Sequence, residues 1–540
     1  MIPDSPIPDL PILTILPPEV MPLKYTLSLV VLLSVFGTSL CWAQGGQPLR
    51  LASEVPERVL LLGSDASERL LEEGRAQVLD FQLYEAERTF RRLDRQPDGR
   101  AAARYYLASA SFLKALVTDE RVYFDEFYER YDSLRLVLKG LPASRWKTYL
   151  LAEAYLQFAF VAVKNESYFR SALAGRKAYA LFRDLIADDA AFYEPYKGMG
   201  LMHLFIGTMP KGQRRLLKVL GYGGTIQQGL RELEDAAAHS RLNQDEASIY
   251  LALADVTLNN SAAGGVEILA RLHRTHPESA FLAYLYGFAL LSNRRAVEAE
   301  DLLREAVEAG TTAEYFFIDY AEFSLAEALF RQNRFTEAEP FYRHYLKRHR
   351  GEALKALALY ELGLTLEMQG RRAEALPLYR QIQGDRIYDT DRWAYRAAQK
   401  RAAAPLTARQ RQLVLGRNAY DAGAYDQAAV LLQAVFDDDG ASTAERAEAS
   451  YRLGRVFHAQ GRLDEALRAY YYAVAHPPTD PMARWAPWSR FYAAEIYVQR
   501  GDTPRARAAF EAVLAYDEPF DYQEALEQQA KAALGRLKGD

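Results

Sequence analysis

A glycine-rich segment, Gly221-Tyr-Gly-Gly224, precedes a predicted helix and is the first place where the sequence offers chemistry. Backbone N–H groups at a helix N-terminus bind anions such as phosphate, and glycines let a ligand approach them. The segment lacks the Lys-Ser/Thr pair of a nucleotide-binding P-loop and the strand that precedes one in a dinucleotide-binding fold. We therefore interpret it as a tight corner between two helices and expect no cofactor there.

Metal-binding and catalytic side chains do not occur at the spacing that their chemistry needs. His273 and His276 are three residues apart, but Pro277 follows them and no acidic residue stands beside them at ligand spacing. Histidines in the last turn of a helix are typical of a solvated helix end, which the helix dipole favours. No zinc-protease or serine-hydrolase motif occurs. The sequence therefore predicts no catalytic residue and no metal site.

The charge balance argues against nucleic acid as a partner. The 540 residues carry a net charge of −5, which excludes a strongly basic footprint over the whole chain. Basic pairs such as Arg91-Arg92 and Arg214-Arg215 are short, and acidic residues are interspersed among the basic ones along the sequence. Half of the residues are hydrophobic and a quarter are charged, as in ordinary globular proteins.

The first 43 residues predict export. Residues 21–43 combine a basic start, the apolar run 26–40 and small residues before a cleavage point after Ala43, as a secretory signal does. Residues 1–20 hold six prolines and no basic residue, so we expect translation to begin at Met21. The apolar run is shorter than the roughly 20 residues of a transmembrane helix. An uncleaved signal anchor remains the alternative.

Cys41 is the one cysteine of the chain, which excludes disulfide bridges within it. It follows the apolar run as a lipidated cysteine does, although Leu40 before it is larger than bacterial lipoprotein signals prefer. A lipid anchor at Cys41 is therefore a second way to the envelope. With cleavage after Ala43 the mature protein has no cysteine, which suits an oxidising compartment. We expect a periplasmic or envelope-associated bacterial protein, with an extracellular one as the less favoured outcome.

From Ser67 onward the apolar residues recur with the period of an α-helix, and no run alternates as a strand would. Glycine and proline stops predict about two dozen antiparallel helices with short connections. Longer helices are expected over Arg121–Leu138 and Trp146–Lys164, and an additional helix around Trp393–Lys400. The sequence thus predicts an all-α fold.

A spacing pattern repeats along the chain: a small residue, an alanine twelve residues later and a large ring or leucine four residues after that. It occurs at Gly74/Ala86/Phe90, Gly287/Ala299/Leu303, Ala326/Ala338/Tyr342, Gly363/Ala375/Tyr379, Gly416/Ala428/Leu432, Gly454/Ala466/Tyr470 and Ala494/Ala506/Phe510. This pattern resembles the tetratricopeptide repeat (TPR), a helix pair that stacks into an α-solenoid. We expect the small residue and the alanine to mark a close helix crossing, and the large residue to fill the gap to the next pair.

The middle of the chain is similar to a second family. Gly198-Met-Gly200 lies in a helix that leads to Pro210, Gly221-Tyr222 forms the corner, and Gly229-Leu230, Leu233 and Ala236 open the next helix. The order of these residues resembles the inclusion-body-clearance family of TPR proteins and exported bacterial TPR proteins of the same layout. The resemblance covers about residues 70–310 and implies a protein without enzymatic activity. We predict a linker over 44–66, a helical region over 67–240 and a TPR array over 241–540.

A TPR superhelix binds partners on its concave face, which the first helix of each pair lines. Counting from the small residue places ten candidate partner-binding residues there: Phe281, Tyr284, Phe288, Tyr320, Phe323, Tyr360, Tyr451, Arg455, Trp488 and Phe491. Aromatic side chains suit extended peptides, amphipathic helices or glycan faces. The alternative is that longer repeats bury these rings inside a tighter superhelix.

The function that follows is an exported, non-enzymatic TPR scaffold that binds a protein or peptide on its concave face. An envelope-anchored assembly or structural factor is the first alternative. An enzyme with a site in residues 100–260 is the second. No nucleic acid is expected as a partner, and a membrane only through the N-terminal anchor.

Overall fold

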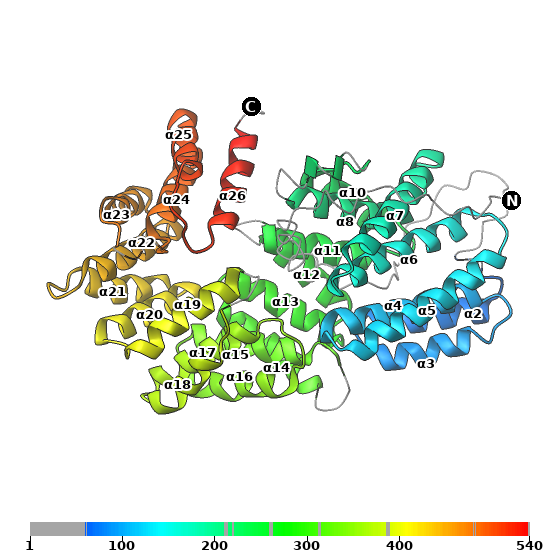
Figure 1. The fold of residues 1–540 in the computed structure, drawn as a ribbon, viewed down its shortest axis with the longest axis horizontal. Coiled ribbons are helices and arrows are strands. Elements are labelled where there is room, and N and C mark those ends of the chain that lie inside the picture. Colours follow the sequence, from blue (N-terminus) through cyan, green and yellow to red (C-terminus); the bar gives the residue numbers. More distant parts are fainter. Residues whose placement is uncertain are drawn as a thin grey trace.

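The computed structural model describes residues 60, 62–209, 214–215, 217–218, 221–258, 263–310, 315–384, 389–478, 480 and 482–537. The predicted signal, the start at Met21, Cys41 and Pro210 lie outside these residues. The described part is all-α, as predicted, with 24 helices and no strand (Figure 1).

The helices pack each on the one that precedes it in the sequence, through most of the described chain. In order they are α2 (Asp65–Leu79), α3 (Leu83–Leu93), α4 (Arg100–Thr118), α5 (Arg121–Gly140), α6 (Arg145–Lys164), α7 (Tyr168–Asp188), α8 (Glu194–Thr208), α10 (Ile226–His239), α11 (Gln244–Leu258), α12 (Ala263–Thr275), α13 (Ala280–Ser292), α14 (Ala296–Ala309), α15 (Ile318–Arg331), α16 (Phe335–Arg348), α17 (Lys355–Met368), α18 (Arg372–Gln381), α19 (Asp389–Ala403), α20 (Ala408–Asp421), α21 (Tyr425–Phe436), α22 (Thr443–Ala459), α23 (Leu463–Ala475), α24 (Trp485–Gln499), α25 (Thr503–Leu514) and α26 (Gln523–Arg536).

Consecutive helices pack as hairpins, and the hairpins stack side by side into a solenoid. Helices α5 and α6 confirm the two long helices predicted from the sequence, and α19 confirms the additional helix between two repeats. Helix α19 packs on α17 and α18, so the next pair, α20 and α21, is displaced and α20 reaches α15. The inserted helix therefore changes the path of the solenoid.

The small residue of each repeat lies at a close crossing between the two helices of a pair. A Cβ atom on Gly363 would lie 2.5 Å from Cε1 of Tyr379, and one on Gly74 would lie 2.5 Å from Cε1 of Phe90. A Cβ atom on Gly454 would overlap the Tyr470 ring in the same way. The predicted pattern is thus confirmed as the packing rule of the fold, because no larger side chain fits at the crossing.

The large residue has a second role beside the predicted one. Phe90 stacks on Tyr106 of α4 with ring centroids 4.9 Å apart, as expected for a contact with the next pair, and it also covers Gly74 of its own pair. Tyr470 likewise covers Gly454 and stacks on Tyr492 of α24, with ring centroids 5.9 Å apart. One ring therefore fixes the crossing within a pair and the step to the following pair.

The glycine-rich segment in the middle of the chain is a corner between α8 and α10, as predicted. Gly200 and Gly229 allow the two backbones to approach, since a Cβ atom on Gly229 would lie 2.6 Å from the carbonyl oxygen of Gly200. Gly224 has φ of +135°, and a side chain there would overlap His203. Thr225 caps α10 by accepting a hydrogen bond from the backbone N–H of Gln228 at 3.1 Å.

The superhelix turns back on itself, so that the N-terminal helices touch the middle of the chain (Figure 1). Phe81, between α2 and α3, stacks on Phe281 of α13 with ring centroids 4.7 Å apart. The Tyr320 hydroxyl of α15 donates to the backbone oxygen of Val117 in α4 at 3.0 Å. One hydrophobic core consequently runs from residue 60 to residue 398, while the pairs from α20 onward have smaller cores of their own.

The crossing rule predicts opposite effects for one chemical change at two helical glycines. Gly454→Ala should lower the free energy of unfolding by about 1–3 kcal/mol, because the added methyl group forces the Tyr470 ring aside. Gly535→Ala in α26 should leave it unchanged or raise it by up to about 1 kcal/mol, because nothing lies within 4 Å of the new methyl group. Urea unfolding followed by circular dichroism measures both. Equal effects at the two positions would contradict the rule.

Candidate functional site

Six of the ten predicted groove residues are core residues in the structure. Phe281, Tyr284, Phe323, Tyr360, Tyr451 and Phe491 are all buried, with at most 7% of each residue exposed. A ring that is buried to this extent cannot contact a partner. The prediction that these rings line an open groove is therefore corrected to a smaller surface, and the alternative of a tighter superhelix describes them better.

The chain itself covers these rings. Phe81 stacks on Phe281, and Phe317 stacks on Tyr284 with ring centroids 5.5 Å apart. The ring of Trp393, on the additional helix α19, lies edge-on to Tyr360 with centroids 5.0 Å apart. The concave face of the middle repeats is thus occupied by the N-terminal helix ends and by α19.

Phe288, Tyr320, Arg455 and Trp488 are the predicted residues that keep part of their surface exposed. Tyr320 already uses its hydroxyl within the fold, on Val117. Phe288 packs near Tyr284 of its own helix, with ring centroids 6.4 Å apart. Arg455 and Trp488 lie in the C-terminal pairs, where α20, α22 and α24 adjoin one another.

Arg455 of α22 is held between tyrosine rings. Its guanidinium carbon lies 3.7 Å from the ring centroid of Tyr492 and 5.4 Å from that of Tyr420. Within the part of the chain that the structure describes, Arg455 makes no ion pair and no hydrogen bond. A guanidinium carries five N–H donors and a permanent charge, so it is left with bonding capacity that the rings do not satisfy.

In two other repeats a glutamate of the first helix accepts a hydrogen bond from the large tyrosine, and the repeat of Arg455 has no such glutamate. The Tyr342 hydroxyl bonds to Glu327, which directly follows the small residue Ala326. The Tyr379 hydroxyl donates to Glu367 at 3.0 Å in the next pair. Arg455 follows Gly454 as Glu327 follows Ala326, and there is no carboxylate for the equivalent tyrosine.

The Tyr470 hydroxyl is accordingly buried with no hydrogen-bond partner in the described structure. The indole N–H of Trp488 is buried and unpaired as well. The rings of both residues lie within 6 Å of the Tyr492 ring, at centroid distances of 5.9 and 5.8 Å. We name Arg455, Tyr470, Trp488 and Tyr492 the Arg455 site. Its guanidinium, hydroxyl and indole donors lack an acceptor among the described residues.

The charge of Arg455 contributes to a lowered pKa of a neighbouring histidine. Burial, together with the positive charge of Arg455, lowers the pKa of His458 to about 4. His458 is therefore neutral at pH 7. The Gln499 side-chain nitrogen lies 2.9 Å from its Nε2. The site consequently carries one positive charge, and an anionic acceptor is the group that would complete it.

Counting from the small residue along the sequence places Arg455 and Trp488 on the binding face but does not identify Tyr470 and Tyr492 as parts of a site. Tyr470 was assigned to packing alone, and Tyr492 lies between two counted positions. The signal that the sequence did offer is the change from glutamate to arginine directly after the small residue, at 327 and 455.

The region 100–260, which the enzyme alternative would use, contains a buried ionic cluster. The Lys197 ammonium lies 2.9 Å from Glu153 and 3.3 Å from Glu246, and all three side chains are at most 4% exposed. The Tyr105 hydroxyl donates to Glu153 at 3.2 Å. Burial, with a contribution from the charge of Glu153, raises the pKa of Glu246 to about 7 although Lys197 acts against it. The cluster joins α4, α6, α8 and α11 inside the core.

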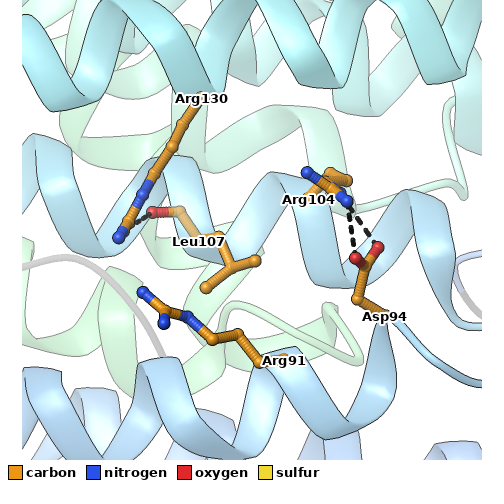
Figure 2. A pocket seen from close by; sticks show the side chains of 5 residues that line it. All are labelled: Arg91, Asp94, Arg104, Leu107 and Arg130. Atoms are coloured by element: carbon orange, nitrogen blue, oxygen red, sulfur yellow. Dashed lines mark hydrogen bonds and ion pairs between the residues drawn. The ribbon is translucent and has the colours of Figure 1, made fainter.

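A cavity of about 230 Å³ lies between α3, α4 and α5, lined by Arg91, Asp94, Arg104, Leu107 and Arg130 (Figure 2). Arg104 binds Asp94 through two bonds of 2.9 and 2.6 Å. Arg130 donates to the Leu107 carbonyl at 2.8 Å and pairs with Glu87. Both guanidiniums are thus satisfied by the protein, and an anion would have to displace a carboxylate to bind there.

No group of three or more histidine, cysteine, aspartate or glutamate side chains within the described residues is arranged to hold a metal ion. Of the helices described, none is both long enough and apolar enough to cross a membrane.

The sequence of the chain matches the tetratricopeptide repeat family over residues 321–391 and 413–481, which are α15–α18 and α20–α23. These segments are TPRs, and the first resemblance inferred from the sequence is confirmed. No curated protein matches the sequence. The similarity of the central segment to the inclusion-body-clearance family stays a prediction.

Several solved structures are similar at low identity. The human IFIT1 dimer with m7Gppp-AAAA has 12% identity and a TM-score of 0.31, with 84% of this chain and 96% of that one covered. Yeast Tom70 has 13% identity and a TM-score of 0.30, with 80% and 88% covered. The apo form of RapI has 11% identity and a TM-score of 0.24, with 76% and 97% covered.

The raised pKa of Glu246 predicts how stability depends on pH. An acid whose pKa rises on folding holds a proton more tightly in the folded chain, so its contribution to stability is lost as pH rises from about 4.5 to about 7. Glu246→Gln removes this loss. The difference in unfolding free energy, variant minus wild type, should therefore increase between pH 5 and pH 8, as measured by urea unfolding at both ends.

Glu374→Gln is the matched control for this experiment. Arg371 lowers the pKa of the exposed Glu374, which is the opposite shift, so that difference should not increase with pH. A Glu246→Gln difference that is flat or falls with pH would contradict the assigned shift.

Proposed function

We propose that this chain, a protein with tetratricopeptide repeats, is a binding scaffold that holds an acidic segment of a partner protein at the Arg455 site. TPR folds are typically non-catalytic scaffolds for protein interaction, and Arg455 lies in the C-terminal pairs, whose hydrophobic cores are separate from the main one. The observation that carries the proposal is the partly exposed guanidinium of Arg455, which lies against tyrosine rings and has no carboxylate partner among the described residues.

The chemistry of the site selects its ligand. Arginine side chains bind carboxylates through two parallel N–H···O bonds, and these charge-assisted bonds are about twice as strong as neutral ones. Arg455 is partly exposed, whereas the Tyr470 hydroxyl and the Trp488 indole N–H are buried. A carboxylate of an Asp or Glu side chain satisfies the guanidinium, whereas a basic or purely apolar segment leaves it unsatisfied.

Export to the periplasm or cell envelope is part of the proposal, on the strength of residues 21–43 alone. A scaffold there would present the Arg455 site to an envelope protein. Anchoring through Cys41 or through an uncleaved signal would instead make it an assembly factor held at the membrane.

Removing the guanidinium should weaken binding without weakening the fold. Peptides selected by phage display against the full chain should be enriched in Asp and Glu, and Arg455→Met should bind them about 10- to 100-fold less tightly. Methionine keeps the apolar contact with Tyr492, so the free energy of unfolding should change by no more than about 1 kcal/mol. Fluorescence anisotropy and urea unfolding measure the two effects.

Arg380→Met, on an exposed position of α18, is the control and should bind as wild type does. Loss of stability in Arg455→Met at unchanged peptide affinity would make Arg455 a structural residue and refute the site. Selected peptides without acidic residues would refute the ligand class while leaving the scaffold role open.

Processing of the N-terminus tests the export proposal. Expression with the native signal should give a mature chain that begins at Gln44 and fractionates with the periplasm, as mass spectrometry of the purified protein would record. Globomycin should change its mass or location only if Cys41 is lipidated. Intact cytosolic protein carrying residues 1–20 would contradict both the start at Met21 and export.

A further inference from the structure

Helix α7 and the corner after α8 carry a run of basic residues without acidic ones. No acidic residue occurs between Tyr168 and Arg183, or between Tyr196 and Arg231. Residues 392–420 are also basic without acidic residues, but there the cations find acids elsewhere in the chain: Arg396 pairs with Asp521 and Arg409 pairs with Asp438. The overall charge of −5 conceals this local excess.

The two stretches adjoin each other in space. The Tyr222 hydroxyl, in the corner before α10, donates to the backbone oxygen of Ala172 in α7 at 2.8 Å. The Tyr222 ring also lies edge-on to Tyr179 of α7, with centroids 5.5 Å apart. Arg215 and Lys218 precede Tyr222 by seven and four residues, and the Tyr222 N–H donates to the Leu217 carbonyl at 3.0 Å, so the end of this segment adjoins α7 through Tyr222.

Three exposed cations of this region lack carboxylate partners, unlike Lys197, which is buried between Glu153 and Glu246. Arg176, Arg215 and Lys218 are exposed and form no ion pair with any described residue. Partly exposed arginines of the repeats behave differently, because Arg334 pairs with Glu337 at 2.6 Å and Arg371 with Glu374 at 2.7 Å. The positive charge around α7 is therefore available to an external anion.

Large apolar side chains are exposed on α7 itself. Phe169 is 71% exposed and Leu173 is 49% exposed. They precede Arg176 at intervals of four and three residues, so all three lie on one stripe of α7. We name Phe169, Leu173, Arg176, Arg215 and Lys218 the basic–apolar face.

We propose that the basic–apolar face docks on the surface of an anionic phospholipid membrane. Cations attract the negative headgroups, and exposed Phe and Leu gain free energy by entering the boundary with the acyl chains. Nucleic acid would satisfy the cations, but an aliphatic side chain such as Leu173 gains nothing from a phosphate backbone. The combination of unpaired cations with exposed hydrocarbon favours the lipid surface.

Flotation of the full-length chain with vesicles tests this inference. The chain should float more with phosphatidylcholine vesicles that contain phosphatidylglycerol than with pure phosphatidylcholine, and salt should reduce the difference. The apolar run 26–40 is uncharged and cannot produce a difference between the two lipids. The readout is therefore this lipid-dependent increment and not binding as such.

Two variants of the face should remove the increment. Arg215→Glu/Lys218→Glu should lower partitioning to the anionic vesicles about 25-fold or more, because each basic residue contributes about fivefold. Phe169→Ser/Leu173→Ser should lower it about tenfold through the lost apolar contact. Both sets are exposed, so circular dichroism and the unfolding midpoint should be unchanged.

Matched changes elsewhere provide the controls. Lys347→Glu/Arg380→Glu, on the exposed faces of α16 and α18, and Val430→Ser, 72% exposed on α21, should retain the increment. Equal flotation with both lipids, or equal loss in the controls, would overturn the proposal. Binding of single-stranded RNA that Arg215→Glu/Lys218→Glu abolishes, with no vesicle binding, would assign the face to nucleic acid instead.

Discussion

The whole solenoid depends on one contact, the ring or leucine that lies directly on a small residue where two helices cross. Because the Gly454 position has no side chain, Tyr470 reaches the opposite backbone and still touches Tyr492 of the next pair. The same residue thus sets the distance within a pair and the step between pairs. Curvature follows from these steps, and curvature brings Phe81 onto Phe281, about 200 residues away along the chain.

The contact between the N-terminal helices and the middle repeats determines which surfaces remain available for a partner. A concave face filled by the molecule's own helix ends gains hydrophobic burial and loses its capacity for a partner. The repeats from α20 onward follow the inserted helix α19, and α20 packs on α15. They keep separate, smaller cores and leave Arg455 partly open to solvent. The N-terminal half offers its surface through the outer side of α7 instead.

The sequence predicted the helices, the repeat spacing and the inserted helix well, because each depends on residues near one another in the chain. Gly363 with Tyr379 and Thr225 with Gln228 are local arrangements that a spacing pattern captures. The sequence left the burial of Tyr284 and Tyr360 as an alternative to an open groove, because burial depends on Phe317 and Trp393 and on how far the superhelix turns. Arg455 could be counted onto the right face, but its lack of a carboxylate depends on the positions of all neighbouring side chains.

The unpaired donors are what separate Arg455 from the other charged groups of the inner repeats. Burying charge is costly unless a partner of opposite charge accompanies it, and the fold elsewhere follows this rule, as Lys197 does between Glu153 and Glu246. At Arg455 the fold offers only tyrosine faces, which stabilise a cation less than a carboxylate does. The Tyr470 hydroxyl adds the cost of a second unsatisfied group. A carboxylate bound at the partly exposed guanidinium would relieve the cost at Arg455, and this free energy would appear as binding energy.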